Sequence, residues 1–127
     1  MEAAPFLMFQ GQARDALTAY RATFPDFEEV LLQEHPAGPM GGQIAMARIR
    51  VGGLEIMLND SPPIHDFTFT PSSSIFITCD SEDQLRLLAE RLGDGGAFLM
   101  PVDSYGFSAL FCWVADRFGV SWQLNLP

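Results

Sequence analysis

The order of predicted elements repeats along the chain, and this repeat limits the fold more than any other sequence feature. Residues 1–60 read as strand, helix, strand, strand, strand, and residues 73–127 read in the same order. Three apolar helix positions also match at a constant shift: Leu17, Tyr20 and Phe24 fall on Leu85, Leu88 and Leu92. A matched element order is harder to obtain by coincidence than a few matched residues. We therefore predict an α+β fold of paired βαβββ modules.

The first module, residues 1–60, is predicted from its periodicity and its turn residues. A short apolar run over Pro5–Phe9 is typical of a buried strand, and apolar residues at helical spacing follow it until Pro25. The Gly52-Gly53 pair is a strong hairpin signal. The later elements predicted here are a strand over Glu28–His35, a Pro- and Gly-rich loop over 36–42, and hairpin strands over Gln43–Val51 and Leu54–Asn59.

The second module, residues 73–127, follows a Pro-containing linker over 61–72. Ser81 with Gln84 three residues later forms a capping box, so we predict a helix that begins there and ends at Gly93. The predicted strands of this module are Ser73–Cys79, Phe98–Val102, Phe107–Ala115 and Val120–Leu126. We expect the whole chain, 1–127, to form one domain because its length falls in the usual range.

Composition narrows the class of partner. Hydrophobic residues make up 48% of the chain and charged residues 18%, which is typical of a globular protein. The net charge of −9 repels phosphate backbones, so we expect no nucleic-acid partner. No apolar stretch approaches the roughly 20 residues that span a bilayer, and no signal peptide is seen, so we expect a cytoplasmic protein without a membrane partner. Cys79 and Cys112 lie in apolar runs and are interpreted as reduced, buried thiols.

Several runs resemble one known family over essentially the whole chain. These runs are Phe6–Tyr20, Ile56–Asp60, His65–Pro71 and Tyr105–Trp122. They resemble the PhnB-like (3-demethylubiquinone 3-methyltransferase-like) branch of the vicinal oxygen chelate superfamily, which includes glyoxalases, bleomycin-resistance proteins and dioxygenases. The resemblance implies a curved mixed sheet around a cavity and a homodimer. It does not imply a single activity for this branch.

Relatives in that superfamily hold a divalent metal ion with His and Glu side chains on the first and last strands of each module. By strand register, the corresponding positions here are Pro5 or its neighbours, Met57, Ser74 and Gln123. Proline offers no side-chain donor, and thioether, hydroxyl and amide groups are poor ligands for such an ion. We therefore expect neither a metal nor another cofactor.

The same positions favour a ligand cavity. Six residues are predicted to line it, two in the first module and four in the second: Arg48, Met57, Ser74, Trp113, Gln123 and Asn125. Aromatic walls with a few polar groups suit a small organic molecule. The competing interpretation is that these side chains simply fill the interior.

An enzyme with an atypical or absent metal site is the alternative function. Its acid/base candidates are Glu55, Asp60, His65 and Asp66, while a lone His35 is interpreted as a solvated side chain. Other signals for catalysis are weak. Gly93–Gly96 closes a helix instead of opening one, and Cys112 lies between Phe111 and Trp113, where desolvation disfavours the thiolate.

Overall fold

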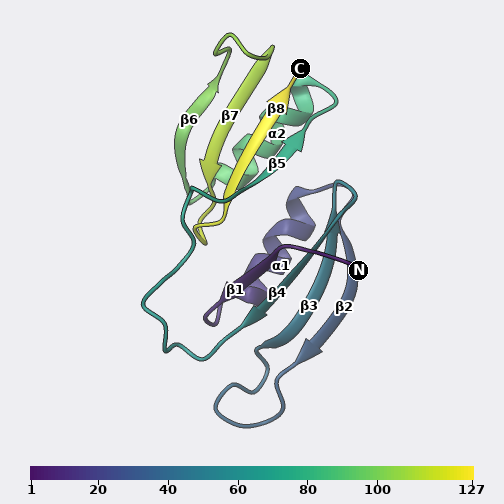
Figure 1. Ribbon diagram of the computed structural model, residues 1–127, viewed down its shortest axis with the longest axis vertical. Coiled ribbons are helices and arrows are strands. Elements are labelled where there is room, and N and C mark those ends of the chain that lie inside the picture. The colour runs from purple at the N-terminus through teal and green to yellow at the C-terminus, as the bar shows by residue number, and fades with distance from the viewer. The chain divides into compact units, whose positions relative to one another are not determined.

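The computed structural model describes all 127 residues and divides them into two compact units, Met1–Asp66 and Phe67–Pro127. Each unit contains one helix and one four-stranded mixed sheet (Figure 1). The predicted α+β fold of paired βαβββ modules is confirmed. The linker expected over 61–72 is shared between the units, and its first half belongs to the first unit.

The first unit follows the predicted element order. Its elements are β1 (Phe6–Phe9), α1 (Ala13–Thr23), β2 (Glu28–Glu34), β3 (Ile44–Val51) and β4 (Leu54–Asp60). The strands lie in the order β1-β4-β3-β2. β1 is parallel to β4, whereas the other neighbours are antiparallel. The parallel pair requires a crossover, and α1 supplies it.

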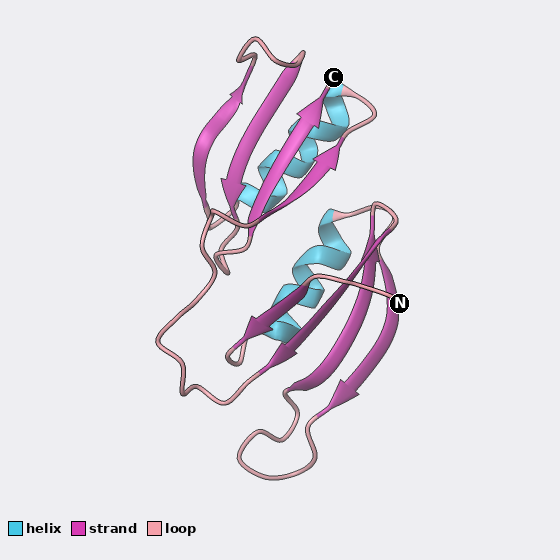
Figure 2. Cartoon of the chain, in the orientation of Figure 1, coloured by secondary structure: helices cyan, strands magenta, loops and turns pink.

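The second unit repeats this arrangement. Its elements are β5 (Ser74–Thr78), α2 (Glu82–Gly93), β6 (Ala97–Asp103), β7 (Leu110–Ala115) and β8 (Ser121–Leu126). The strand order is β5-β8-β7-β6, with β5 parallel to β8. Figure 2 shows the helices of both units in cyan and their strands in magenta.

In each unit the helix covers one face of the sheet, and the core lies between them (Figure 1). The buried side of α1 includes the apolar residues Ala16, Leu17 and Tyr20, which recur at helical spacing. On β4 the buried residues Ile56 and Leu58 alternate with half-buried ones, because successive strand side chains point to opposite faces. The second core is built in the same way, with Leu85, Leu88, Trp122 and Leu124.

The two helices begin differently. The N-cap of α2 is Ser81, whose Oγ accepts from the Gln84 N–H at 3.1 Å, while Gln84 Oε1 accepts from the Asp80 N–H at 2.8 Å. The predicted capping box therefore forms, with its return bond displaced by one residue. The N-cap of α1, Gln12, makes no side-chain cap. The carboxylate of Asp60 instead accepts from the N–H groups of Gly11 and Ala13.

The strand predicted over Phe107–Ala115 begins three residues later, at Leu110. Its pairing with β6 ends at Asp103 opposite Phe111, so residues before Leu110 have no ladder partner. Phe107 lies in the connecting loop and packs its ring on Phe111 and Tyr105. The sequence prediction included Phe107 in the strand because a phenylalanine is equally apolar in a strand and in a packed loop.

Neither helix spans a membrane, since α1 has 11 residues and α2 has 12.

Candidate functional site

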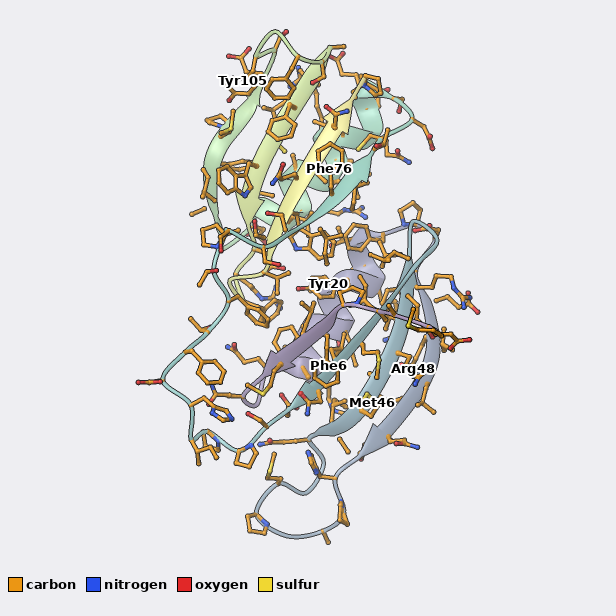
Figure 3. The ribbon with its side chains drawn as sticks, viewed as in Figure 1. Phe6, Tyr20, Met46, Arg48, Phe76 and Tyr105 are labelled. Carbon is orange, nitrogen blue, oxygen red and sulfur yellow. The ribbon has the colours of Figure 1, made fainter.

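The face of each sheet that its helix does not cover is called here the open face. On the first sheet the open face carries Phe6, Met8, Met46, Arg48, Met57 and Asn59. On the second sheet it carries Ser74, Phe76, Phe111, Trp113, Gln123 and Asn125. All six residues predicted to line a cavity therefore lie on open faces. Figure 3 labels Phe6, Met46 and Arg48 in the first unit and Phe76 in the second.

Two of the predicted residues meet on the first sheet. Met57 is the register partner of both Phe6 on β1 and Arg48 on β3, so the three form a row across the strands. Arg48 Nη1 lies 4.0 Å from Glu55 Oε1 on the same face. The buried atoms Arg48 Nε and Asn59 Oδ1 have no hydrogen-bond partner. Unpaired buried polar atoms carry a desolvation cost, so these two atoms are free to form a hydrogen bond.

The other four predicted residues lie on the second sheet. Trp113 is the register partner of Gln123, and Gln123 is also opposite Phe76. Trp113 Nε1 donates to Ser121 Oγ at 2.8 Å, and Ser121 Oγ lies 2.6 Å from Ser74 Oγ. Ser74 Oγ in turn donates to the Pro71 carbonyl at 3.4 Å. The polar groups of Trp113 and Ser74 are therefore already paired, so a ligand would meet the Trp113 ring and the Ser74 side chain through van der Waals contact. The Gln123 amide remains the polar group of this row.

Four aromatic rings on and beside this open face form what we call the aromatic cluster: Phe76, Tyr105, Phe107 and Phe111. The Phe107 and Phe111 rings are 5.0 Å apart and edge to face, and Tyr105 meets Phe111 edge to face at 6.2 Å. Phe76 lies 6.5 Å from Phe111. Sequence reasoning missed this cluster, although strand parity puts Phe76 on the same face as Ser74 and Phe111 on the same face as Trp113.

Two of the acid/base candidates, Glu55 and Asp60, do not come together. Glu55 lies on the open face near the start of β4, whereas Asp60 lies at its end and faces the core. Asp60 is 1% exposed, and its two oxygens accept from the N–H groups of Gly11, Ala13 and Ile44. The role of Asp60 is therefore structural. The His65 N–H is held by Gln10 Oε1 at 3.2 Å in the segment after β4.

The metal-ligand positions of the superfamily hold residues that do not fit a divalent ion. The chain contains no group of three or more His, Cys, Asp or Glu side chains that could hold one. Pro5 contributes only its carbonyl, which already accepts from the Met57 N–H at 2.9 Å. Met57 carries a thioether, Gln123 a neutral amide, and the Ser74 hydroxyl is hydrogen bonded. Hard or borderline ions prefer imidazole and carboxylate ligands.

Both thiols are buried and free, as the sequence predicted. Burial, with a smaller effect of the neighbouring Cys79, raises the pKa of Cys112 to about 11. Burial also raises the pKa of Cys79. Neither thiol is a nucleophile near neutral pH, because the thiolate is the reactive form.

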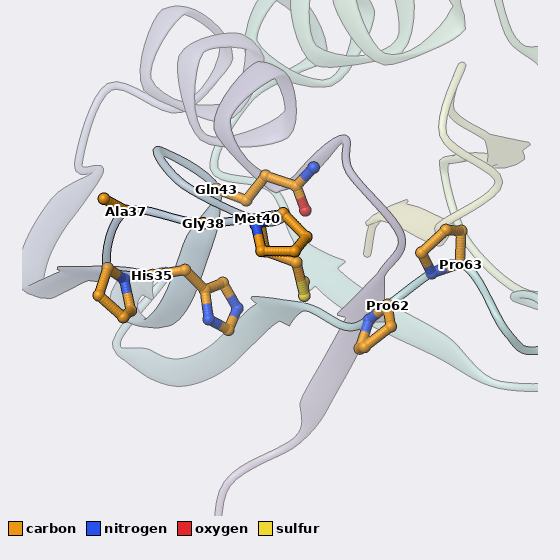
Figure 4. Close-up of a pocket in the computed structure, with 9 residues that line it drawn as sticks. His35, Ala37, Gly38, Met40, Gln43, Pro62 and Pro63 are labelled. Carbon is orange, nitrogen blue, oxygen red and sulfur yellow. The ribbon is translucent and has the colours of Figure 1, made fainter.

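A separate pocket of about 610 Å³ lies in the first unit, between the loop over 36–42 and two prolines after β4. Figure 4 shows His35, Met40 and Pro62 around it. His35 is half-buried, and its Nε2 lies 3.1 Å from the Asp60 carbonyl oxygen, so it is not the solvated side chain that was expected. None of the six predicted residues lines this pocket.

Comparison with solved structures first defines the class of fold. A glyoxylase/bleomycin resistance protein/dioxygenase domain from Frankia sp. EAN1pec superposes with a TM-score of 0.69 at 18% identity, covering 99% of this chain and 90% of that one. A protein from Pseudomonas aeruginosa, PA1353, superposes with a TM-score of 0.83 at 29% identity, covering 99% and 97%. The fold is that of the vicinal oxygen chelate superfamily.

The family follows from closer matches. A PhnB protein from Bacillus cereus superposes with a TM-score of 0.93 at 39% identity, and the match covers 100% of both chains. The family profile described as 3-demethylubiquinone-9 3-methyltransferase matches residues 1–125. The chain belongs to this family, in its PhnB-like branch, as the sequence runs predicted.

Proposed function

We propose that the chain is a binding protein whose open faces take up a small organic molecule, partly aromatic or cationic, without a metal ion. The observation that carries the proposal is the chemistry of these faces. They carry aromatic rings, thioethers and amides beside Arg48, Arg50 and Glu55, with Phe76 56% exposed and Phe6 47% exposed. Large exposed apolar side chains on one face are typical of ligand or protein contacts.

The residues proposed to contact a ligand on either open face are the six that the sequence predicted. Arg48 and Met57 act from the first sheet, with the thioether adapting to the shape of the ligand. Trp113 supplies ring surface on the second sheet, and the amides of Gln123 and Asn125 supply hydrogen bonds, with Ser74 packed beside them. This set contains no acid/base pair, so an enzyme of the glyoxalase or dioxygenase type is not favoured. A methyltransferase activity, which the family description names, also has no support from these residues.

A homodimer in the cytoplasm is part of the same proposal. A second copy of the chain can cover exposed apolar side chains of the first, and their burial is favourable by about 25 cal/mol per Å². The net charge of −9 does not oppose binding of a small cationic molecule.

A thermal-shift screen of aromatic, cationic and neutral metabolite-like molecules tests the proposal. A ligand at about 100 times its Kd adds roughly 2.7 kcal/mol to stability, which raises the melting temperature by several degrees. Stabilisation is expected to weaken in Phe76→Ala, because Phe76 is the exposed register partner of Gln123 on the open face. It should persist in Leu87→Ala, because Leu87 is an exposed apolar residue on α2, across the sheet from the open face. A screen in which no molecule stabilises the chain would overturn the proposal.

A further inference from the structure

Three of the four residues in the aromatic cluster are exposed to solvent. Phe107 is 63% exposed, Phe76 is 56% exposed and Tyr105 is 37% exposed, whereas Phe111 is buried beneath them. Tyr105 and Phe107 are nearly parallel, with an interplanar angle of 13° and a centroid distance of 6.2 Å. Figure 3 labels Tyr105 and Phe76 in the second unit. Exposed ring faces carry the negative side of the aromatic quadrupole, which attracts a cation.

The rings are also held in place without a ligand. Phe111 is anchored in β7 by its register partners, Asn125 on β8 and Asp103 on β6. The Tyr105 hydroxyl donates to the Pro101 carbonyl at 2.5 Å, which fixes this ring across the turn after β6. Because Phe111 packs against each of the other three rings, the cluster is ordered before any molecule binds. Prior order lowers the entropy cost of binding.

The charge beside the cluster is negative. Asp103 is exposed, faces Phe111 across the β6–β7 pair and lies two residues from Tyr105. Desolvation, followed by the Asp103 carboxylate, raises the pKa of Tyr105, so the carboxylate acts on the cluster electrostatically. The arginines of this unit lie elsewhere. Arg86 and Arg91 belong to α2, and Arg117 stacks over the Phe118 ring at 4.6 Å.

We propose that the aromatic cluster binds an organic ammonium ion, with the cation over the exposed rings of Phe76 and Phe107 and Asp103 as its counter-charge. This inference rests on the proposed function and names the class of ligand for it. A quaternary ammonium suits the site because its charge is spread over methyl groups. These methyl groups pack on rings and do not require hydrogen-bond acceptors.

Choline and its neutral isostere, in which a quaternary carbon replaces the nitrogen, test the proposal because they differ only in charge. The full chain is titrated with each molecule, and binding is followed by NMR. Choline is expected to bind at least about fivefold more tightly than the isostere, the ratio that corresponds to roughly 1 kcal/mol of cation–π attraction. Its methyl signals should move upfield, because protons above a ring face are shielded.

Three variants locate the site. Phe107→Leu keeps an apolar side chain but removes a ring, and Asp103→Asn removes the charge, so each should reduce the preference for choline over the isostere. Phe98→Leu is the matched control. Phe98 is a half-exposed phenylalanine on β6 whose ring lies against Gly93 at the end of α2, away from the cluster.

The possible failures are distinguishable. Equal binding of choline and the isostere, or loss of the preference in Phe98→Leu alone, would overturn the ammonium site and leave the proposed function standing. Affinity for choline that falls as the protein is concentrated would also overturn it, because a second copy then occupies the cluster. Failure of choline together with every molecule of the thermal-shift panel would overturn both proposals.

Discussion

The carboxylate of Asp60 joins three segments of the first unit through hydrogen bonds to the N–H groups of Gly11, Ala13 and Ile44, at 2.8 to 3.0 Å. It supplies to α1 the N-terminal acceptor that Gln12 lacks. The buried carboxylate of the second unit, Asp116, acts locally: its oxygens accept from the Phe118 and Val120 N–H groups and from Trp122 Nε1, all within the β7–β8 hairpin. Each unit therefore contains one buried aspartate whose carboxylate accepts three hydrogen bonds.

Asp60→Asn should destabilise the protein by roughly 2–3 kcal/mol. The amide keeps one acceptor oxygen but turns its NH₂ group toward an N–H donor that then has no partner, and bonds to a charged acceptor are worth more than neutral ones. The loss is measured by urea denaturation. Asp66→Asn is the control because Asp66 is exposed, and an equal loss in both variants would contradict the structural role of Asp60.

Cys112 makes stability depend on pH in the alkaline range. Its pKa is raised to about 11, so the unfolded chain releases the thiol proton first and binds fewer protons than the folded chain between pH about 9 and 11. Stability attributable to this thiol is complete below that window and is lost as pH rises through it. The chain contains no lysine, so few other groups titrate there.

Urea denaturation from pH 8 to 10.5 checks this dependence. The wild-type chain should lose stability as pH rises, and Cys112→Ala should show a shallower decline, whatever its own stability at pH 8. A decline of the same slope in both proteins would show that the Cys112 thiol is not the titrating group.

At the scale of elements, the capping box is the feature that sequence and structure share most directly. Ser81→Ala removes the Oγ that accepts from the Gln84 N–H, and we expect a loss of about 1 kcal/mol. Thermal or urea denaturation measures the loss. Ser73→Ala is the comparison, because exposed Ser73 contributes only its backbone N–H to a turn. Similar stability of the two variants would count against the cap.

The two helices also differ in whether their N-terminal caps could be predicted from the sequence. The α2 cap is local, with donor and acceptor three residues apart, so the sequence predicted it. The α1 cap comes from Asp60, 47 residues from Ala13, and no local pattern reveals it. Asp60 was therefore interpreted as an acid/base candidate, since a buried structural carboxylate and a catalytic one look the same in sequence.

Strand alternation predicted which face Met57 and Gln123 occupy, but not the interactions made there. It placed Met57 and Gln123 correctly, because side-chain direction follows from parity along a strand. It could not show that the Trp113 ring N–H is already held by Ser121, since that bond depends on the β7–β8 register. The aromatic cluster was missed because Tyr105 and Phe107 come from a loop, where periodicity carries no information.

At the scale of the whole molecule, we expect a homodimer. Light scattering should give a mass twice that of the 14.0 kDa chain at micromolar concentration. Phe76→Ala and Leu87→Ala both remove an exposed apolar side chain, so comparing their masses shows which face supports assembly. A monomer at all accessible concentrations would contradict the proposed dimer without affecting the ligand-binding residues of either sheet.

Neutral amide, hydroxyl and thioether groups occupy the strand positions that would have to carry imidazoles and carboxylates to hold a metal ion. Elemental analysis of the purified chain after mild chelation tests it most directly. We expect far less than one equivalent of nickel, zinc, manganese or iron per chain. One tightly retained equivalent of any of these metals would contradict it.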